Sequence, residues 1–368
     1  MDTLIPIQYY ISIYYNLLLL ITLIVFLQSY GITLESQENL KSKKAFGFII
    51  FIIILLYIGL RPINYRFGDM VIYNIQFKNF ANGILPEYKK DVLFEFFQFN
   101  FSKIGSAGAF FFVCAVLYIY PLYAFSKKVF KDYWFYAFFM LIISFSFWAY
   151  GTNGIRNGIA TSLFLYGVSR NEKWKVFAIL FISLFIHKSL MLPIFAYIIT
   201  LFYNKPKSFF YFWLFTIPLS LALGGFFTAF FLGLGIIEEK SVSSYLGEFD
   251  QASEGVLLKV GFRWDFLLYS ASGVFAGWYY VIKKKFEDPF YFQLLNVFLL
   301  VNGFWVLVIK ANYSNRFAYL SWFLLGVIII YPLLKSKFFE NQHQVIARII
   351  IAYFAFTYFM EIILGQPT

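Results

Sequence analysis

The stretch from Ala45 to Leu60 reads AFGFIIFIIILLYIGL and contains no charged side chain. Apolar helices of about 20 residues are the elements that cross the hydrocarbon core of a membrane. Further apolar runs cover residues 8–30, 105–125, 133–150, 155–170, 174–187, 189–204, 208–236, 264–282, 290–309, 316–334 and 345–363. The sequence therefore predicts an all-α polytopic integral membrane protein with about twelve transmembrane helices. We expect residues 1–368 to form a single transmembrane domain.

The composition leads to the same class of protein. Of the 368 residues, 61% are hydrophobic and 13% are charged, whereas soluble domains contain about 25% charged residues. At about 20 residues a span, the roughly 224 apolar residues leave room for about eleven spans. These figures exclude a disordered chain and a collagen-like fibre. The single cysteine, Cys114, excludes a disulfide scaffold and argues against redox chemistry.

Two of the apolar segments need separate interpretation. The first 30 residues contain Asp2, no Lys or Arg and no small-residue cleavage site, so we expect a retained span rather than a signal peptide. The runs 174–187 and 189–204 are short and almost meet. They form either a tight hairpin or one long broken helix.

The net charge of +11 is explained by membrane topology. The odd-numbered loops between the predicted spans hold 17 basic and 7 acidic residues, and the rest of the chain holds 13 basic and 12 acidic residues. Basic loops stay in the cytoplasm, so both termini and the even-numbered loops are predicted to lie outside it. The charge gives no reason to expect a nucleic-acid partner.

The sequence lacks the common motifs of nucleotide and metal chemistry. It contains no GxxxxGK[ST] phosphate loop, no GxGxxG after a strand, no HExxH and no Asp-x-Asp pair. The predicted cytoplasmic loops are also too short for a nucleotide-binding domain. We therefore expect neither a cofactor nor a bound metal.

Two longer external loops are predicted, at residues 61–104 and 237–263. The first includes the aromatic stretch 91–99, flanked by charges, which we interpret as an interfacial helix on the outer membrane surface. The second is rich in acidic residues. It is either a lid or acceptor-binding loop, or a solvated connector.

Charged residues follow the second span closely. Arg61, Arg66 and Asp69 lie within nine residues of its end. One interpretation makes the two arginines ligands of an anion. The alternative is that they reach the membrane interface, with Arg66 paired to Asp69.

The junction between the fourth and fifth spans predicts an anion site. If a helix begins near Asn153, then Arg156 lies in its first turn, where the helix dipole disfavours a cation unless an anion is present. Gly154 and Gly158 leave one face of this helix open to a neighbour or a ligand. Asn157 follows Arg156 and adds an amide to the same turn. The alternative is a packing motif in which Arg156 caps a loop.

Further candidates lie at other span ends on the same predicted face. His187 and Lys188 stand between the sixth and seventh spans, Arg263 precedes the ninth, and Asn315 and Arg316 open the eleventh. The topology rule predicts few cations on this side, so those that remain need a partner. An anionic ligand at the outer leaflet is the simplest partner, and guanidinium groups suit pyrophosphate because they bind its oxygens in bidentate fashion.

Several short motifs together resemble a known family. These are Gly59-Leu60-Arg61 with Gly68-Asp69 and Tyr73, then residues 155–160 (IRNGIA), then residues 185–189 (FIHKS). In order and spacing they resemble the EpsG-type bacterial polysaccharide polymerases, relatives of the Wzy O-antigen polymerases. The family pattern has a Gln after the arginine of the fifth span, where this chain has Asn157.

The resemblance implies a multi-span glycosyltransferase of the GT-C kind in the bacterial inner membrane. Such an enzyme works at the outer face, on glycans linked to undecaprenyl pyrophosphate. It moves the growing chain from its lipid carrier onto a newly delivered lipid-linked repeat unit. The partners it implies are this lipid-linked donor and acceptor, the membrane lipid, a chain-length regulator and a flippase.

The residues fit that chemistry without a metal. Arg156, Arg61 and Arg316 are predicted to stabilise the pyrophosphate leaving group, with Arg66 and Lys188 in support. Either His187 or Asp69 would accept the proton of the acceptor hydroxyl, and His187 is favoured because Arg66 would neutralise Asp69. The remaining predicted substrate-binding residues are Arg263, Asn153, Asn157 and Asn315.

Three other functions remain open at this point. An O-antigen ligase uses the same donor with a different acceptor, but the loop 237–263 is modest for a ligase. A flippase or transporter of lipid-linked sugars would bury charges at mid-membrane and show an internal repeat, neither of which is evident. A purely structural membrane protein would not explain the cations on one face.

Overall fold

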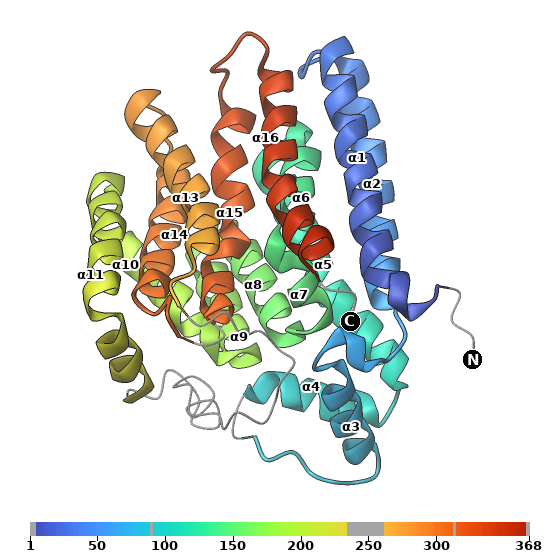
Figure 1. Ribbon diagram of the computed structural model, residues 1–368. Coiled ribbons are helices and arrows are strands. Elements are labelled where there is room, and N and C mark those ends of the chain that lie inside the picture. The colour runs from blue at the N-terminus through green and yellow to red at the C-terminus, as the bar shows by residue number, and fades with distance from the viewer. Residues whose placement is uncertain (1–4, 89–90, 234–260, 312–313, 366–368) are drawn as a thin grey trace. The chain divides into compact units, whose positions relative to one another are not determined.

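The computed structural model describes residues 5–88, 91–233, 261–311 and 314–365 (Figure 1). These residues form helices and connecting segments, and none of them forms a strand. The α-helices are α1 (Tyr10–Gly31), α2 (Gln37–Gly59), α3 (Met70–Ala81), α4 (Val92–Ser102), α5 (Ala107–Phe130), α6 (Trp134–Ile142), α7 (Phe145–Thr152), α8 (Ile155–Val168), α9 (Lys173–Ile186), α10 (Met191–Phe202), α11 (Pro206–Gly233), α13 (Trp264–Trp278), α14 (Pro289–Leu307), α15 (Asn315–Lys335) and α16 (Gln342–Tyr358).

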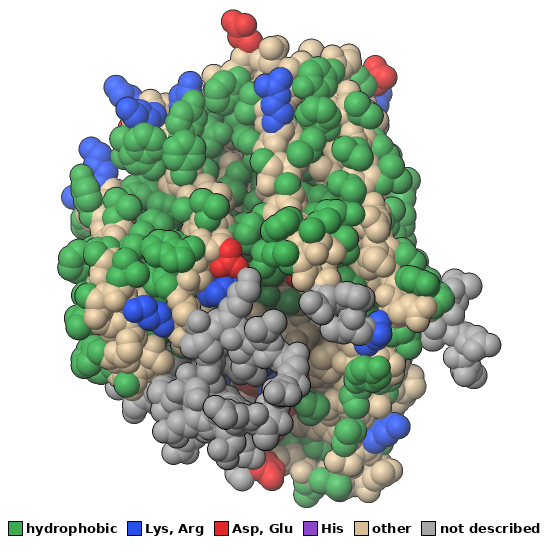
Figure 2. All heavy atoms as spheres, in the orientation of Figure 1, with side chains coloured by type: hydrophobic (Ala, Val, Ile, Leu, Met, Phe, Trp, Pro, Cys, Tyr) green, Lys and Arg blue, Asp and Glu red, His purple; other side chains and the backbone are tan. Residues whose placement is uncertain are grey.

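Seven helical segments of the described chain are long and apolar enough to cross a membrane. They are Ile7–Gly31, Gln37–Gly59, Ala107–Ile142, Pro206–Phe230, Pro289–Leu307, Asn315–Lys335 and Gln342–Ile363. Hydrophobic side chains also predominate on the surface in Figure 2, as expected for contact with lipid. The prediction of an all-helical polytopic membrane protein is thereby confirmed.

The count of about twelve spans is not reached. The other five predicted runs do form helices, but α8 and α9 have 14 residues each, α10 has 12 and α13 has 15. A helix of 14 residues is about 21 Å long, less than the hydrocarbon thickness of about 30 Å. The run 133–150 is divided between α6 and α7 because Ser144 is extended (φ −68°, ψ 146°).

The run 174–204 breaks at His187. This residue is extended (φ −152°, ψ 120°), so α9 ends at Ile186. A single 3₁₀ turn, η4 (Lys188–Leu190), follows before α10 begins. The chain there is two helices rather than one, and the break presents His187 and Lys188 at the end of α9.

The predicted external loop 61–104 is largely helical. It contains the short turn η2 (Tyr65–Phe67), and then α3 and α4, which pack against each other (Figure 1). The helix predicted around residues 91–99 is therefore present as α4. Of the second predicted loop, 237–263, only residues 261–263 are among those described.

The chain divides into two compact units, and each is described by itself. Unit 1 comprises Met1–Met191 and Ile330–Thr368, and unit 2 comprises Leu192–Ile329. In unit 1, α1 packs against α16, α2 against α5, α5 against α8, and α8 against α9. The single transmembrane domain expected from the sequence stays a prediction.

A buried asparagine connects four helices of unit 2. Asn302 of α14 accepts a hydrogen bond from Trp213 Nε1 of α11 at 2.7 Å. It donates to the hydroxyls of Ser270 in α13 and Ser321 in α15, at 3.0 and 2.9 Å. Because each of these polar groups has its partner, the network stabilises the apolar interior instead of disrupting it.

Gly158 allows α7 and α8 to approach closely. A Cβ atom at this position would lie 2.6 Å from the carbonyl oxygen of Tyr150 in α7. At Gly154 it would meet the ring of the same tyrosine at 3.3 Å. The open helix face predicted from these two glycines thus receives a neighbour, and this contact helps to hold the start of α8.

We expect Gly158→Ala to lower the free energy of unfolding by about 1–3 kcal/mol, because the new methyl group would press against a backbone carbonyl. The thermal midpoint of the purified protein in detergent measures this change. Gly31→Ala is the control, since a Cβ there has nothing within 4 Å. Equal midpoints for the two variants would contradict the proposed close contact.

Candidate active site around Asp91

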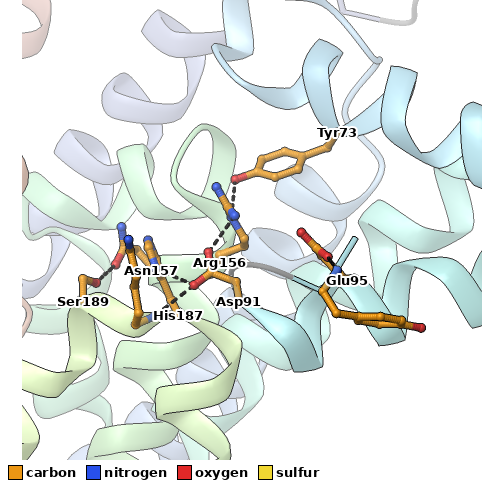
Figure 3. Close-up of polar contacts among 9 residues, drawn as sticks. Tyr73, Asp91, Glu95, Arg156, Asn157, His187 and Ser189 are labelled. Atoms are coloured by element: carbon orange, nitrogen blue, oxygen red, sulfur yellow. Dashed lines mark hydrogen bonds and ion pairs between the residues drawn. The ribbon is translucent and has the colours of Figure 1, made fainter. Parts of the chain in front are cut away.

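A buried carboxylate, Asp91, is the centre of a polar cluster in unit 1 (Figure 3). Asp91 precedes α4 in the left-handed conformation (φ 50°, ψ 47°), which is uncommon for a residue other than glycine. An Asp at this position usually caps its own helix, but the Asp91 side chain makes no capping hydrogen bond. Its two oxygens are bound instead by residues of α8 and of the turn after α9.

Arg156 binds this carboxylate from the first turn of α8. Its Nη1 atom lies 2.6 Å from Asp91 Oδ2, and its Nε donates to the hydroxyl of Tyr73 at 3.0 Å. The Tyr73 ring also lies under the guanidinium, 5.4 Å from it. The Arg156 side chain is still 31% exposed, so part of the cation can be reached by a ligand.

His187 and Lys188 bind the second oxygen of Asp91. His187 Nδ1 lies 3.2 Å from Oδ1, and the backbone N–H of Lys188 donates to the same oxygen at 3.0 Å. With a proton on Nδ1, Nε2 of His187 is left with its lone pair. Within the described chain, no hydrogen-bond partner lies at Nε2, and the Lys188 side chain is exposed.

Hydrogen bonds in a second layer fix the backbone around these groups. Ser189 Oγ donates to Asn157 Oδ1 at 2.6 Å, which joins the turn after α9 to the start of α8. Gln98 of α4 donates to the carbonyl of Tyr73 in α3 at 2.8 Å. Glu95 of α4 accepts a hydrogen bond from the backbone N–H of Tyr88 at 3.0 Å.

The electrostatic balance favours the ionised form of Asp91. Burial alone would raise the pKa of this carboxyl. The hydrogen bond from His187, the charge of Arg156 and the N–H of Lys188 outweigh that cost, so the pKa of Asp91 lies below its usual range. Burial also raises the pKa of Tyr73 in spite of Arg156 beside it. Tyr73 is thus a neutral hydroxyl near pH 7.

The structure brings four of the predicted site residues together: Arg156, Asn157, His187 and Lys188. The anion that Arg156 needs in the first turn of α8 is the carboxylate of Asp91. An external anion is thus not required to explain Arg156, although the exposed part of its guanidinium can still bind one.

Arg61 is placed differently from the expectation that it meets substrate directly. Its side chain is buried, and its guanidinium donates to the carbonyls of Ile58, in the last turn of α2, and Thr152, at the end of α7. Cations are favourable at such helix C-termini. Burial lowers the pKa of Arg61 to about 10, so it stays charged near pH 7. Arg61 fixes the chain just before α8, and its direct contact with substrate stays a prediction.

Arg66, Asp69 and Asn153 lie close in sequence to residues of the cluster, and one hydrogen bond links Asp69 to Asn153. The backbone N–H of Asp69 donates to Asn153 Oδ1 at 2.9 Å, which ties the start of α3 to the turn before α8. Gly68, at φ +62°, permits this approach, because a Cβ there would lie 2.4 Å from the Asn153 side chain. No ion pair joins Arg66 to Asp69 in the part of the chain that is described.

The remaining predicted residues belong to unit 2. Arg263 makes a bidentate ion pair with Asp265, at 2.9 and 2.7 Å, and stacks on Phe266 with its guanidinium 3.6 Å from the ring. Asn315 is half-buried and Arg316 is exposed, both in the first turn of α15. Their roles in binding substrate stay predictions.

Asp91, the central residue of the cluster, is not among the site residues that the sequence predicts. In the sequence it is only a charge at the edge of an aromatic stretch, and Tyr73 is only part of the family motif. An acid before a helix normally indicates a cap, so its position gave no sign of another role. Only the folded chain brings Asp91 to residues that are 65 and 96 positions away.

The described residues contain no group of three or more His, Cys, Asp or Glu side chains placed to hold a metal ion. The cluster instead combines a cation, an oriented imidazole and a buried carboxylate. This set can bind an anion and accept a proton from a hydroxyl group.

The chain is similar to one described protein family. The model of the EpsG family matches residues 44–367, which is most of the chain. No curated protein and no solved structure matches it significantly. The resemblance drawn from the motifs around Arg61, Arg156 and His187 is confirmed by this match.

We expect Asp91→Asn to lower the free energy of unfolding at neutral pH by about 1–3 kcal/mol, because charged hydrogen bonds to Arg156 and His187 are lost. The depressed pKa of Asp91 makes its contribution present above the ordinary Asp pKa of about 3.9 and lost as the pH falls further. The stability gap between wild type and variant should therefore narrow below about pH 4. Thermal midpoints between pH 7 and pH 2.5 measure it.

Asp69→Asn is the matched control for this pH series. The Asp69 side chain is exposed and makes no ion pair with the described residues, so its replacement should change the midpoint little at any pH. If the difference in thermal midpoint between wild type and Asp91→Asn stayed constant down to pH 2.5, the conclusion that Asp91 is ionised in the folded protein would be wrong.

Proposed function

The chain belongs to the EpsG family, and from this premise we propose that it is a membrane polysaccharide polymerase that uses Asp91, Arg156 and His187 as its reaction centre. Its donor is a growing glycan on undecaprenyl pyrophosphate, and its acceptor is a repeat unit on the same carrier. The observation that carries the proposal is the single carboxylate that binds both a partly exposed arginine and a histidine whose other nitrogen is unpaired among the described residues.

The proposed reaction exchanges one bond to the anomeric carbon of the donor for another. An acceptor hydroxyl oxygen bonds to this carbon, and the bond from the carbon to the pyrophosphate oxygen breaks. The electron pair leaves with the pyrophosphate, and the hydroxyl proton goes to the protein. No oxidant, nucleotide or metal takes part in this balance.

His187 is the proposed proton acceptor. The Asp91 carboxylate accepts a hydrogen bond from the Nδ1–H of His187, which keeps the ring in the tautomer with a basic Nε2. The same contact stabilises the imidazolium that forms when Nε2 takes the hydroxyl proton. Asp69, the other candidate from the sequence, is exposed, and its hydrogen bond to Asn153 is made by its backbone, so His187 is the stronger choice.

Arg156 is proposed to stabilise the charge on the leaving group, with Lys188 beside it. Negative charge grows on the pyrophosphate oxygen as the bond to the sugar breaks, and a fixed guanidinium lowers the energy of that state. Tyr73 and Asp91 hold the guanidinium in place before substrate arrives. This preorganisation is what makes a cation effective in catalysis. Arg61 is proposed to act indirectly: its hydrogen bond to the carbonyl of Thr152 holds the turn that leads to Arg156.

The remaining parts of the proposal concern location and partners. The polymerase is proposed to be of the GT-C kind and to act at the outer face of the bacterial inner membrane, where flipped lipid-linked units arrive. A flippase would supply these units, and a chain-length regulator would limit the product. Arg170, Lys173 and Lys175 lie at the end of α8 and the start of α9, at the other ends of these helices from Arg156 and His187, and basic residues of this kind favour the cytoplasmic side.

The first test is incubation of the purified protein in detergent with undecaprenyl-pyrophosphate-linked repeat units, EDTA and no nucleotide. We expect a ladder of longer glycans on a gel, because the proposed chemistry needs only the residues of the cluster. Absence of a ladder, together with movement of the same lipid across a liposome bilayer, would overturn the polymerase in favour of a transporter.

Two substitutions should separate the proposed roles. Arg156→Ala should lower the polymerisation rate by about 10²-fold or more, because the developing charge loses its cation. His187→Ala should lower the turnover rate by about 10²–10⁴-fold with nearly unchanged donor binding, as expected for loss of a general base. Initial rates and binding of the labelled donor measure both effects.

Arg170→Ala is the control for loss of an arginine just after the other end of α8, where Arg170 donates to Tyr166 and Ser169. It should retain polymer formation. Wild-type chain lengths in Arg156→Ala would refute the role of this cation, and an equal loss of donor binding in His187→Ala would move His187 to the donor site.

A further inference from the structure

An apolar groove begins where the polar cluster ends. It has a volume of about 560 Å³ and lies between α4 and α9, both in unit 1. Its walls are Val92, Leu93 and Phe96 from α4 and Phe181, Ile182 and Phe185 from α9, with Tyr88 at one end. Among the residues that the structure describes, no charged side chain lines it.

The groove is continuous in sequence with the cluster on both sides. Val92 directly follows Asp91, and Phe185 comes two residues before His187. At 1.5 Å per residue, Phe181 lies about 9 Å along the helix from His187. The groove therefore runs away from the cluster along the last turns of α9 and the first turns of α4.

The side chains that line the groove are exposed, although several of them are large and apolar. The side chains of Phe181, Phe96 and Phe185 are 63%, 53% and 40% exposed. The rings of Phe181 and Phe185 lie 4.6 Å apart and form one side of the hollow. Such a surface is stable only where an apolar ligand or lipid covers it.

We propose that this groove binds the isoprenoid chain of the lipid-linked pyrophosphate while the pyrophosphate lies at Arg156 and Lys188. The proposal rests on the function inferred above, and it adds the place where the isoprenoid chain of the carrier binds. An anionic headgroup and an apolar chain joined in one molecule match a cationic cluster joined to an apolar groove. Burial of the chain against four aromatic rings would hold the sugar–phosphate bond at the cluster.

The binding test uses wild-type protein in nanodiscs of phosphatidylethanolamine and phosphatidylglycerol. The probe is a polyprenyl pyrophosphate with a photoreactive diazirine in its chain, and the labelled peptides are identified by mass spectrometry. We expect labelling to concentrate on α4 and α9 and to be competed by unlabelled polyprenyl pyrophosphate. Labelling spread over many helices, or competed equally by added phosphatidylglycerol, would show an ordinary lipid surface and overturn the proposal.

A matched pair of variants tests the groove walls. Phe181→Ala combined with Phe185→Ala should weaken probe binding about tenfold or more, because two aromatic contacts with the chain are lost. Phe48→Ala in α2 is the control, since Phe48 is 51% exposed and does not line the groove. Equal binding by the double variant and the control would overturn the proposal.

Kinetics separate this inference from the proposed function. The wild type should prefer a repeat unit on a long prenyl chain over one on a three-isoprene chain, through a lower KM, and the double variant should lose this difference in KM. If polymer forms but the double variant keeps the wild-type preference for a long prenyl chain, the groove proposal alone is rejected. Labelling of α4 and α9 without any ladder would reject the polymerase and keep the groove as a polyprenyl-pyrophosphate site.

Discussion

The ionised carboxylate of Asp91 is the constraint on which the candidate site depends. Burying a charge is costly unless it is paired and hydrogen-bonded, and Asp91 meets that requirement only where the start of α4, the start of α8 and the end of α9 converge. Three features of the local chain serve this meeting. They are the left-handed backbone at Asp91, the break of the helix at His187 and the missing side chain at Gly158, which brings α8 close to α7.

Hydropathy predicted the helices well because an apolar backbone segment in lipid has to satisfy its own hydrogen bonds. In the part of the chain that the structure describes, each apolar run found in the sequence forms one or two helices. Hydropathy could not predict which helices are long enough to span a membrane, because the breaks depend on single residues. Ser144 and His187 end helices by adopting extended conformations inside or beside apolar runs. The polar groups that result lie at the breaks, and the site is built from them.

The arginines show where reasoning from charge succeeds and where it stops. A cation in the first turn of α8 predicted a nearby anion, and the structure has one, but it is a side chain of the same protein. Arg61, which looked equivalent in the sequence, is buried and caps the ends of α2 and α7. Position along the chain places both arginines at span ends, whereas only the packing of the helices decides which guanidinium stays exposed. The same holds for Asp91, whose partners are distant in sequence.

Asp91 also limits how tightly the cluster can hold an anion. It neutralises part of the charge of Arg156, so a pyrophosphate group would share this guanidinium with a carboxylate. That sharing weakens binding of the donor before it reacts, and tight binding of the unreacted substrate does not by itself raise the rate of the chemical step. In the proposed reaction the charge on the leaving oxygen grows as the sugar bond breaks, and the attraction to Arg156 grows with it. The affinity for the carrier would then come mainly from the apolar groove, which leaves the polar cluster to distinguish the transition state from the substrate.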